Sequence, residues 1–289
     1  LKQPNEDNPA FAYSKNFGLE YNLSFMNYYL SEQLNKEKNF YVLNSSKWLL
    51  NCGVSNAYNS KLWYLTKTPF SNNFFKEAVS DLSSLYGSIK GLSKKLLILD
   101  LDDTLWGGIV GEVGWKNLRI GGHDHLGEAF RDFQIQIKSL KNQGIILALA
   151  SKNDEATAIK AINSHPEMIL SMKDFVTHRI NWEDKAKNIV DIVNELNLGL
   201  QSVVFLDDSP FERARVREAL PEVLVPELPK DPTDYNVCLS KLRCFDTTNI
   251  TEEDRVRANL YKSEFKRTKL KQKLKSLSDW IKTLDLTIE

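Results

Sequence analysis

The stretch "LLILDLDDTLWGG" (residues 96–108) joins an apolar segment directly to a cluster of acidic and hydroxyl side chains. Its first four residues form a short apolar run, which is typical of a strand buried on both faces. Asp100, Asp102, Asp103 and Thr104 follow at the point where such a strand would end. Residues two apart on an extended chain point to the same side, so Asp100 and Asp102 are expected to face one place. The stretch therefore predicts a buried strand that carries carboxylates at its end.

Strands and helices alternate along the middle of the chain. Besides 95–102, the segments "GIILALAS" (144–151), "SVVFLDDS" (202–209) and "EVLVPEL" (222–228) have the pattern of buried parallel strands. Helical patterns cover 127–144, 153–165 and 183–199, with Asn153 as a helix N-cap and Gly144 and Gly199 as helix ends. This alternation predicts an α/β fold, a Rossmann-like doubly wound parallel sheet.

Ligand sites in such sheets lie outside the carboxyl ends of the strands. Asp100, Ser151 and the pair Asp207 and Asp208 all fall at predicted strand ends. Three stretches that are far apart in the sequence are therefore expected to meet at one site.

The predicted organisation has three parts. Residues 1–90 have the pattern of an N-terminal α/β segment, with helices near 19–36 and 73–90 and a strand "FYVLN" at 40–44. We interpret this segment as the remnant of a larger upstream domain. Residues 91–235 are the predicted catalytic core, and 236–289 a C-terminal helical extension dominated by one long helix from Thr251.

Composition excludes several classes of protein. Lys and Arg number 38 and Asp and Glu number 38, so no excess charge favours nucleic acid or a membrane surface, and neither is an expected partner. The longest apolar runs are too short to span a bilayer. Cys52, Cys238 and Cys244 are widely spaced and odd in number, which predicts free thiols in a reducing compartment, the cytoplasm.

Carboxylates gathered at strand ends repel one another unless a cation neutralises them. Mg²⁺ suits such a site because it prefers oxygen ligands. One carboxylate can then attack phosphorus, and a second can act as acid and base. Ser151 could hold a phosphate oxygen, and Lys185 could balance the charge of an aspartyl-phosphate. As plain turn residues that cap a helix, Asp100 and Asp102 would leave Lys185 and Asp208 without a role.

"DLDDT" (100–104), Ser151, Lys185 and "FLDDS" (205–209) match, in order, the four motifs of the haloacid dehalogenase (HAD) phosphotransferases. The chain from about residue 40 to about 285 further resembles the FkbH-like family, HAD subclass IIIC. This likeness is carried by "LWYLTKTPFS" (62–71), "LDLDDTLWGGIVGEVG" (99–114), "FQIQIKSLKNQGIILALASKN" (133–153), "HPEM" (165–168), "INWEDKAKNI" (180–189) and "VVFLDDSPFERARVREALPEVLVPELPKDP" (203–232).

The FkbH-like resemblance implies a function in polyketide pathways. Members of that family are associated with loading a glyceryl-type unit from 1,3-bisphosphoglycerate, a phosphorylated three-carbon substrate, onto the phosphopantetheine thiol of an acyl carrier protein. Phosphate is lost in the process. The expected cofactor is Mg²⁺.

The resemblance also implies roles for single residues. Asp100 would be the nucleophile, and Asp102 the acid/base and, through its carbonyl, a metal ligand. Asp208 would bind the metal with Asp207 in support, and Lys185 would neutralise charge. The expected substrate-binding residues are Thr104, Ser151, Lys152 and Asn153.

Cys52 is the candidate for capture of an acyl group, because a thiolate can accept it from an acyl phosphate as a thioester. FkbH-like enzymes are thought to use a cysteine in this way. The alternative is a buried, small apolar residue, the commoner fate of a free cysteine. Cys238 and Cys244 lie past the last sheet motif and suit the role less well.

Two further segments allow more than one interpretation. Residues 106–127 are too short for a cap domain; their glycines and alternating apolar residues predict a hairpin flap, which either leaves the site open to a macromolecular acceptor or merely closes the sheet edge. His123 and His125 within it are expected at the surface. The C-terminal helix is basic, which gives either a docking face for an acidic carrier or a solvated face. Its basic residues are Lys262, Lys266, Arg267, Lys269, Lys271, Lys273 and Lys275.

Two rival functions remain at this level. One is a plain HAD phosphatase, acting on a phosphorylated small molecule or protein. The other is a non-catalytic docking domain of a synthase, against which the intact Asp100, Asp102, Lys185 and Asp208 argue.

Overall fold

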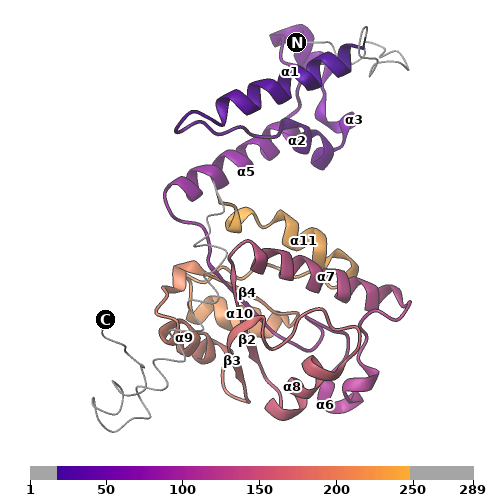
Figure 1. Ribbon diagram of the computed structural model, residues 1–289, viewed down its shortest axis with the longest axis vertical. Coiled ribbons are helices and arrows are strands. Elements are labelled where there is room, and N and C mark those ends of the chain that lie inside the picture. The colour runs from indigo at the N-terminus through magenta and orange to yellow at the C-terminus, as the bar shows by residue number, and fades with distance from the viewer. Residues whose placement is uncertain (1–17, 248–289) are drawn as a thin grey trace, which may run out of the picture. The chain divides into compact units, whose positions relative to one another are not determined.

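The computed structural model describes residues 18–247 of the chain. It divides the chain into two compact units, residues 1–90 and residues 91–289. The second unit carries the sheet (Figure 1). The predicted long basic helix from Thr251 lies outside the described residues. Within residues 18–247, no helix has the length and apolar character needed to cross a membrane.

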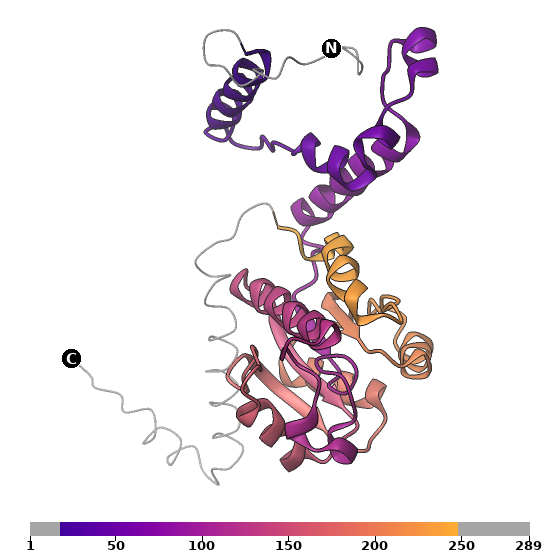
Figure 2. The ribbon, with the colours of Figure 1, turned by 90° about the vertical axis from the view of Figure 1, so that its right-hand side faces the viewer.

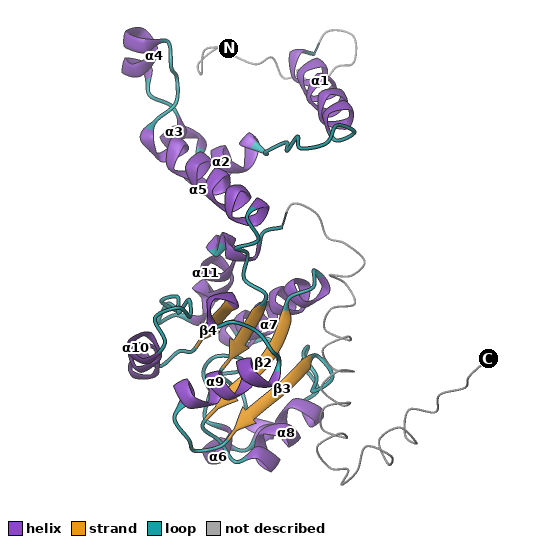
Figure 3. Ribbon diagram, turned by 90° about the vertical axis from the view of Figure 1, so that its left-hand side faces the viewer, coloured by secondary structure: helices purple, strands orange, loops and turns teal. Residues whose placement is uncertain are grey.

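A parallel four-stranded sheet forms the centre of the second unit (Figure 3). Its strands are β1 (Leu96–Leu99), β2 (Ile146–Ser151), β3 (Phe175–Ile180) and β4 (Val203–Leu206), in the order β3-β2-β1-β4. All four residues of β1 are fully buried, because β1 pairs with β2 on one side and with β4 on the other. The α/β, doubly wound parallel fold predicted from the sequence is confirmed.

Helices cover both faces of the sheet. Leu97 and Leu99 of β1 pack with α7 (His125–Asn142), α8 (Glu155–Ser164) and α11 (Tyr235–Lys241). Leu96 and Ile98 pack on the opposite face with α9 (Lys185–Glu195) and α10 (Pro210–Ala219). Figure 2 shows α7 and α11 side by side over the first face. Each buried leucine or isoleucine contributes roughly 1.5–3 kcal/mol, so the two faces hold β1 in place.

The sheet differs from the prediction in one strand. Residues 222–228 are not a strand; they make only an isolated parallel bridge, Val204 with Leu224, before Pro226 removes a backbone donor. The fourth strand is β3, which lies at the sheet edge beside β2. Its sequence "FVTHRI" mixes apolar and polar residues because an edge strand is partly exposed, so it lacks the apolar run that marks the other three strands.

The first unit is helical in its described part. It contains α1 (Leu19–Leu34), α2 (Ser45–Cys52), α3 (Val54–Ala57), α4 (Ser60–Thr66) and α5 (Asn72–Ile89). The predicted strand at 40–44 is wrong: the segment is a loop, and Phe40, Tyr41 and Val42 are exposed. With no strand beside it among residues 18–90, it has no ladder partner. Asn44 instead caps α2 by accepting a hydrogen bond from Ser46 N.

The predicted hairpin flap is also wrong in form. Residues 106–127 contain a one-turn helix α6 (Val110–Val113) and a 3₁₀ turn η1 (Trp115–Asn117). Gly107 and Arg119 pair in an isolated antiparallel bridge, which closes the segment at its base. A side chain at position 107 would collide with Phe130 at 2.9 Å, so the chain needs glycine there. His123 and His125 are exposed, as expected.

Two predicted helix boundaries shift. Asp154, not Asn153, caps α8 by accepting a hydrogen bond from Thr157 N, and this leaves the Asn153 side chain free to turn elsewhere. α9 ends at Glu195, and the left-handed residue after it is Asn197 with φ 51°, not Gly199. Asparagine tolerates this conformation better than most residues. Gly144, with φ 98°, does follow the end of α7.

Gln134 of α7 ties that helix to the loop after β1. Its Nε2 donates to Leu105 O at 2.7 Å, and its Oε1 accepts from Ile169 N and Leu170 N at 3.0 and 3.2 Å. The substitution Gln134→Met keeps the shape but leaves three backbone groups without partners. We expect urea denaturation to show a loss of about 3 kcal/mol in unfolding free energy.

The exposed Gln143, near the end of α7, is the matched control, since Gln143→Met should change stability by less than about 0.5 kcal/mol. A loss below about 1 kcal/mol for Gln134→Met would mean that these backbone groups find other partners.

Candidate active site

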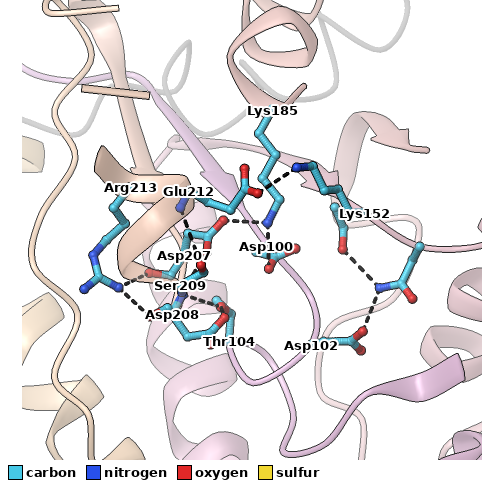
Figure 4. A network of polar contacts seen from close by, with 12 residues as sticks. Asp100, Asp102, Thr104, Lys152, Lys185, Asp207, Asp208, Ser209, Glu212 and Arg213 are labelled. Atoms are coloured by element: carbon cyan, nitrogen blue, oxygen red, sulfur yellow. Dashed lines mark hydrogen bonds and ion pairs between the residues drawn. The ribbon is translucent and has the colours of Figure 1, made fainter. Parts of the chain in front are cut away.

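The ends of three neighbouring strands form the floor of the site. Asp100 follows β1, Ser151 ends β2, and Asp207 follows β4. Because β1 lies between β2 and β4, these residues come together without any unusual bend of the chain. Lys185, at the start of α9, reaches the same floor from the loop after β3, and Figure 4 shows it pointing at Asp100 and Asp207.

Lys185 forms a buried ion pair with two carboxylates. Its Nζ lies 2.9 Å from Asp100 Oδ2 and 2.6 Å from Asp207 Oδ2, and only 3% of the lysine is exposed. Burial by itself would lower the pKa of Lys185, but the two carboxylates outweigh it and raise that pKa above its ordinary value. The lysine therefore stays charged and compensates two buried acids.

Asp207 and Asp208 sit in the turn between β4 and α10. Arg213 of α10 holds this turn by donating to the backbone oxygens of Asp207 and Asp208 at 2.8 and 2.6 Å. Burial, and next the charge of Asp100, raise the pKa of Asp207 in spite of its lysine partner. The same two causes, with Asp103, raise the pKa of Asp208 to about 6. Both shifts arise first from burial and next from the neighbouring carboxylates, and Lys185 offsets them only in part.

Thr104 links the first motif to the last. This fully buried residue accepts a hydrogen bond from Asp208 N at 3.1 Å, and its hydroxyl donates to Asp208 Oδ1 at 3.3 Å. Asp103, between Asp102 and Thr104, takes up a left-handed conformation with φ 51°. The chain thus turns sharply after β1 and brings Thr104 back beneath Asp208.

Asp102 is held by three N–H donors. Its Oδ1 accepts from Trp106 Nε1 at 2.8 Å and from Val110 N at 3.0 Å, and its Oδ2 accepts from Asn153 Nδ2 at 2.9 Å. Burial raises the pKa of Asp102 more strongly than these hydrogen bonds lower it. The result is a fixed carboxyl group that takes up a proton more readily than an exposed aspartate.

Three carboxylates are placed to share a cation. Asp100, Asp207 and Asp208 each offer one oxygen, and these oxygens lie within 4.8 Å of one another. Among the described residues, Asp100 Oδ1 is buried and has no hydrogen-bond partner. A buried carboxylate oxygen without a donor is costly, which indicates that a ligand or a cation completes the site.

A cleft of about 620 Å³ opens above this floor. Lys152 lies on its wall, where its Nζ pairs with Glu212 Oε1 of α10 at 2.7 Å. Asn153 donates to Ser151 Oγ at 3.2 Å as well as to Asp102. The charged and polar residues that line the cleft are Asp100, Asp102, Asp103, Glu112, Ser151, Lys152, Asn153, Asp154, Thr157, Lys185 and Asp208.

The structure thus gathers the residues predicted for the core at one place, while Cys52 lies in the other compact unit. Cys52 is the last residue of α2 and half-buried, and its thiol lies 3.7 Å from Leu49 O. The capture of an acyl group by Cys52 therefore stays a prediction. Burial raises the thiol pKa of Cys238 and of Cys244, to about 11 for Cys244, which disfavours the thiolate form of both.

Sequence reasoning missed the residues that hold the acids in place. Arg213 fixes the turn of Asp207 and Asp208, Trp106 holds Asp102, and Tyr235 of α11 donates its hydroxyl to Asp103 O at 3.0 Å. Arg213 lies near the start of α10, the helix that begins directly after "LDDS". A basic residue this close to the motif is a signal that the sequence does contain. Tyr235, 132 residues away from Asp103, gives no such signal.

No protein-family model matches the chain, and no curated protein matches it either. A solved structure does: the N-terminal part of the protein BF1531 from Bacteroides fragilis, containing a phosphatase domain and complexed with Mg. The two are 40% identical over 84% of this chain, with a TM-score of 0.79. This chain spans 65% of the length of that one.

Two other structures match over about half of this chain. They are the HAD domain of the effector protein Lem4 from Legionella pneumophila (14% identity, 52% of this chain and 93% of that one, TM-score 0.38) and 3-deoxy-D-manno-octulosonate 8-phosphate phosphatase from Moraxella catarrhalis (19%, 54% and 90%, 0.35). The parallel sheet and the strong likeness to the phosphatase-containing structure agree with the HAD fold expected from the sequence.

The ion pair of Lys185 can be tested without any substrate. In Lys185→Met, Asp100 and Asp207 stay buried but lose their cation, so the unfolding free energy at pH 7.5 in EDTA should fall by about 3–5 kcal/mol. Lys187→Met, two residues along α9, removes an exposed pair with Glu183 and should cost less than about 1 kcal/mol. Urea denaturation measures both.

The loss of unfolding free energy caused by Lys185→Met should be smaller at low pH. Without the lysine, the pKa of Asp207, already raised by burial, rises further above its value in the unfolded chain, so the native state binds more protons. Its stability then increases as the pH falls from 7.5 towards 5. An equal loss at both pH values would contradict this account of the ion pair.

Proposed function

We propose that this chain, a member of the HAD superfamily, is a Mg²⁺-dependent enzyme that transfers a phosphoryl group from its substrate to Asp100. The observation that carries the proposal is Asp100 itself: one oxygen is held by Lys185 at 2.9 Å, and the other is buried without a partner on the floor of an open cleft. A carboxylate with one oxygen fixed and one oxygen free is suited to attack phosphorus.

The acidic group fits Mg²⁺. Asp100 and Asp208 would bind the ion directly, with Asp207 in support, because carboxylate oxygens are the ligands that Mg²⁺ prefers. When bound, the ion offsets negative charge on the transferring phosphoryl group. Burial, and next the charges of Asp100 and Asp103, raise the pKa of Asp208 to about 6, and a bound cation would favour its ionised form.

The side chains divide the chemistry as follows. Asp100 attacks phosphorus and becomes an aspartyl-phosphate, while Asp102 gives its proton to the departing oxygen. Asp102 then takes a proton from the water that releases inorganic phosphate. Lys185 compensates the charge of Asp100 throughout. Ser151, which lines the cleft, would orient the phosphoryl group, whereas the fully buried Thr104 hydroxyl acts by holding Asp208.

Asp100→Asn tests this function. We expect phosphate release from acetyl phosphate or p-nitrophenyl phosphate to fall below about 10⁻³ of the wild-type rate, because the amide is not a nucleophile. Asp132→Asn, at an exposed position of α7, is the control and should keep wild-type activity. EDTA should abolish the wild-type rate and Mg²⁺ restore it. Wild-type turnover in Asp100→Asn would refute the proposal.

The finer proposal rests on the sequence resemblance to the FkbH-like family. There, a glyceryl-type unit would move from 1,3-bisphosphoglycerate to the phosphopantetheine thiol of an acyl carrier protein. The thiolate would attack the acyl carbon, a C–S bond would form, and the C–O bond to phosphate would break. The short segment over the cleft supports this version, because it leaves room for an arm to enter.

Cys52→Ala separates acyl capture from phosphoryl chemistry, because sulfur attacks carbon while a carboxylate attacks phosphorus. After incubation with 1,3-bisphosphoglycerate, intact-protein mass spectrometry should show an acyl adduct on the wild type and none on Cys52→Ala. Phosphate release at Asp100 should be equal in both proteins. An adduct of the same size on the variant would assign the role to Cys238 or Cys244. Phosphate release without any adduct or carrier loading would favour the plain phosphatase.

A further inference from the structure

The mouth of the cleft differs in character from its floor. The floor is made of carboxylates and Lys185, whereas Trp182 and Ile109 line the same cleft with apolar surface. Trp182 is 75% exposed and Ile109 43%. Ile109 belongs to the segment after β1, and Trp182 to the loop between β3 and α9. Two elements that are distant in sequence therefore both contribute apolar side chains to a charged cleft.

The loop that carries Trp182 is firmly anchored. Before it, Asn181 N donates to Ser151 O at 3.1 Å, and the Asn181 amide exchanges hydrogen bonds of 3.2 and 2.9 Å with the buried Asn188. After it, Glu183 N donates to Asn181 Oδ1 at 3.0 Å, and Asp184 caps α9. The backbone on both sides of Trp182 is thus held, and this keeps the residue beside the cleft that its exposed ring lines.

A large aromatic ring that is held at the surface beside a ligand site gains stability only when something apolar covers it. We propose that Trp182 and Ile109 form an apolar subsite for an alkyl or amide chain that extends out of the cleft while a phosphoryl group lies on the floor. The inference rests on the proposed phosphoryl-transfer function. It makes Trp182 a specificity residue for chain-like substrates.

Such a chain has two possible sources. It is either the part of the phosphorylated substrate that carries the phosphoryl group, or the arm of an acceptor such as pantetheine. Both carry methylene groups that could contact Trp182 and Ile109, which line the same cleft as Asp100. The experiment therefore uses one probe for each source.

Binding of phosphonates tests the subsite without turnover. Dissociation constants of methylphosphonate and n-hexylphosphonate would be measured by calorimetry with Mg²⁺ present. Each buried methylene contributes roughly fourfold, so the wild type should bind the hexyl compound at least about tenfold more tightly. Trp182→Ala should reduce this preference to about twofold, and Trp182→Phe should keep most of it.

Phe211→Ala is the matched control. Phe211 is 74% exposed, like Trp182, but does not line the cleft, so its variant should keep the full preference for the hexyl compound. Pantetheine would be titrated into the same proteins. Trp182-dependent binding of pantetheine assigns the subsite to an acceptor arm, and dependence with hexylphosphonate alone assigns it to the phosphorylated substrate.

The subsite is refuted if Trp182→Ala binds both probes as the wild type does, or if Phe211→Ala loses the preference equally. Failure of the proposed function looks different. If the wild type binds n-hexylphosphonate through Trp182 but releases no phosphate from a substrate, the subsite is supported and the proposed phosphoryl transfer is refuted.

Discussion

The ion pair of Lys185 with Asp100 and Asp207 is the interaction on which the site depends. Two acids buried at adjacent strand ends would repel each other strongly, and a single buried lysine makes their position tolerable. The pairing needs β1, β4 and the start of α9 in their places at once, so it couples the sheet order to the chemistry. One lysine pairs with two of the acids, while Asp208, whose pKa is raised first by burial and next by the charge of Asp100, has no cation of its own among the described contacts. A divalent cation bound by these carboxylates would offset their negative charge and that of an incoming phosphoryl group.

Around this centre, the residues that hold the acids in place are different from the carboxylate proposed to react. Trp106 and Asn153 hold Asp102, Arg213 holds the turn of the last motif, and Thr104 joins the two. None of the holding hydrogen bonds uses the free oxygen of Asp100. A fixed framework that leaves one oxygen of Asp100 without a hydrogen bond would lower the reorganisation needed during the proposed phosphoryl transfer. The carboxylates of the floor cannot distinguish one phosphorylated compound from another. Trp182 and Ile109, which offer apolar contact, would supply this selectivity.

The sequence by itself determined the strand-end acids and their order. "LLIL" before Asp100 and "VVFL" before Asp207 are apolar because parallel strands are buried on both faces, and this pattern needs no tertiary knowledge to detect. The position of Asp100, Asp102, Ser151, Lys185 and Asp208 around one cleft followed from the rule for the carboxyl ends of such strands. Predictions from the local sequence were wrong for segments whose conformation depends on whether a neighbouring strand pairs with them. The edge strand β3 is half polar, and the apolar segments at 40–44 and 222–228 form no ladder.

Only the tertiary structure decided which groups hold the acids and what lies at the mouth of the cleft. Tyr235 reaches Asp103 from 132 residues away, and Asn153 turns to Asp102 because Asp154 takes over the helix cap. In a sequence, Trp182 is an ordinary apolar residue before a helix; its exposure beside the carboxylates appears only when the loops are in place. The physical reason is range: burial patterns and caps act over a few residues of chain, whereas hydrogen bonds across a site depend on packing that brings distant segments together.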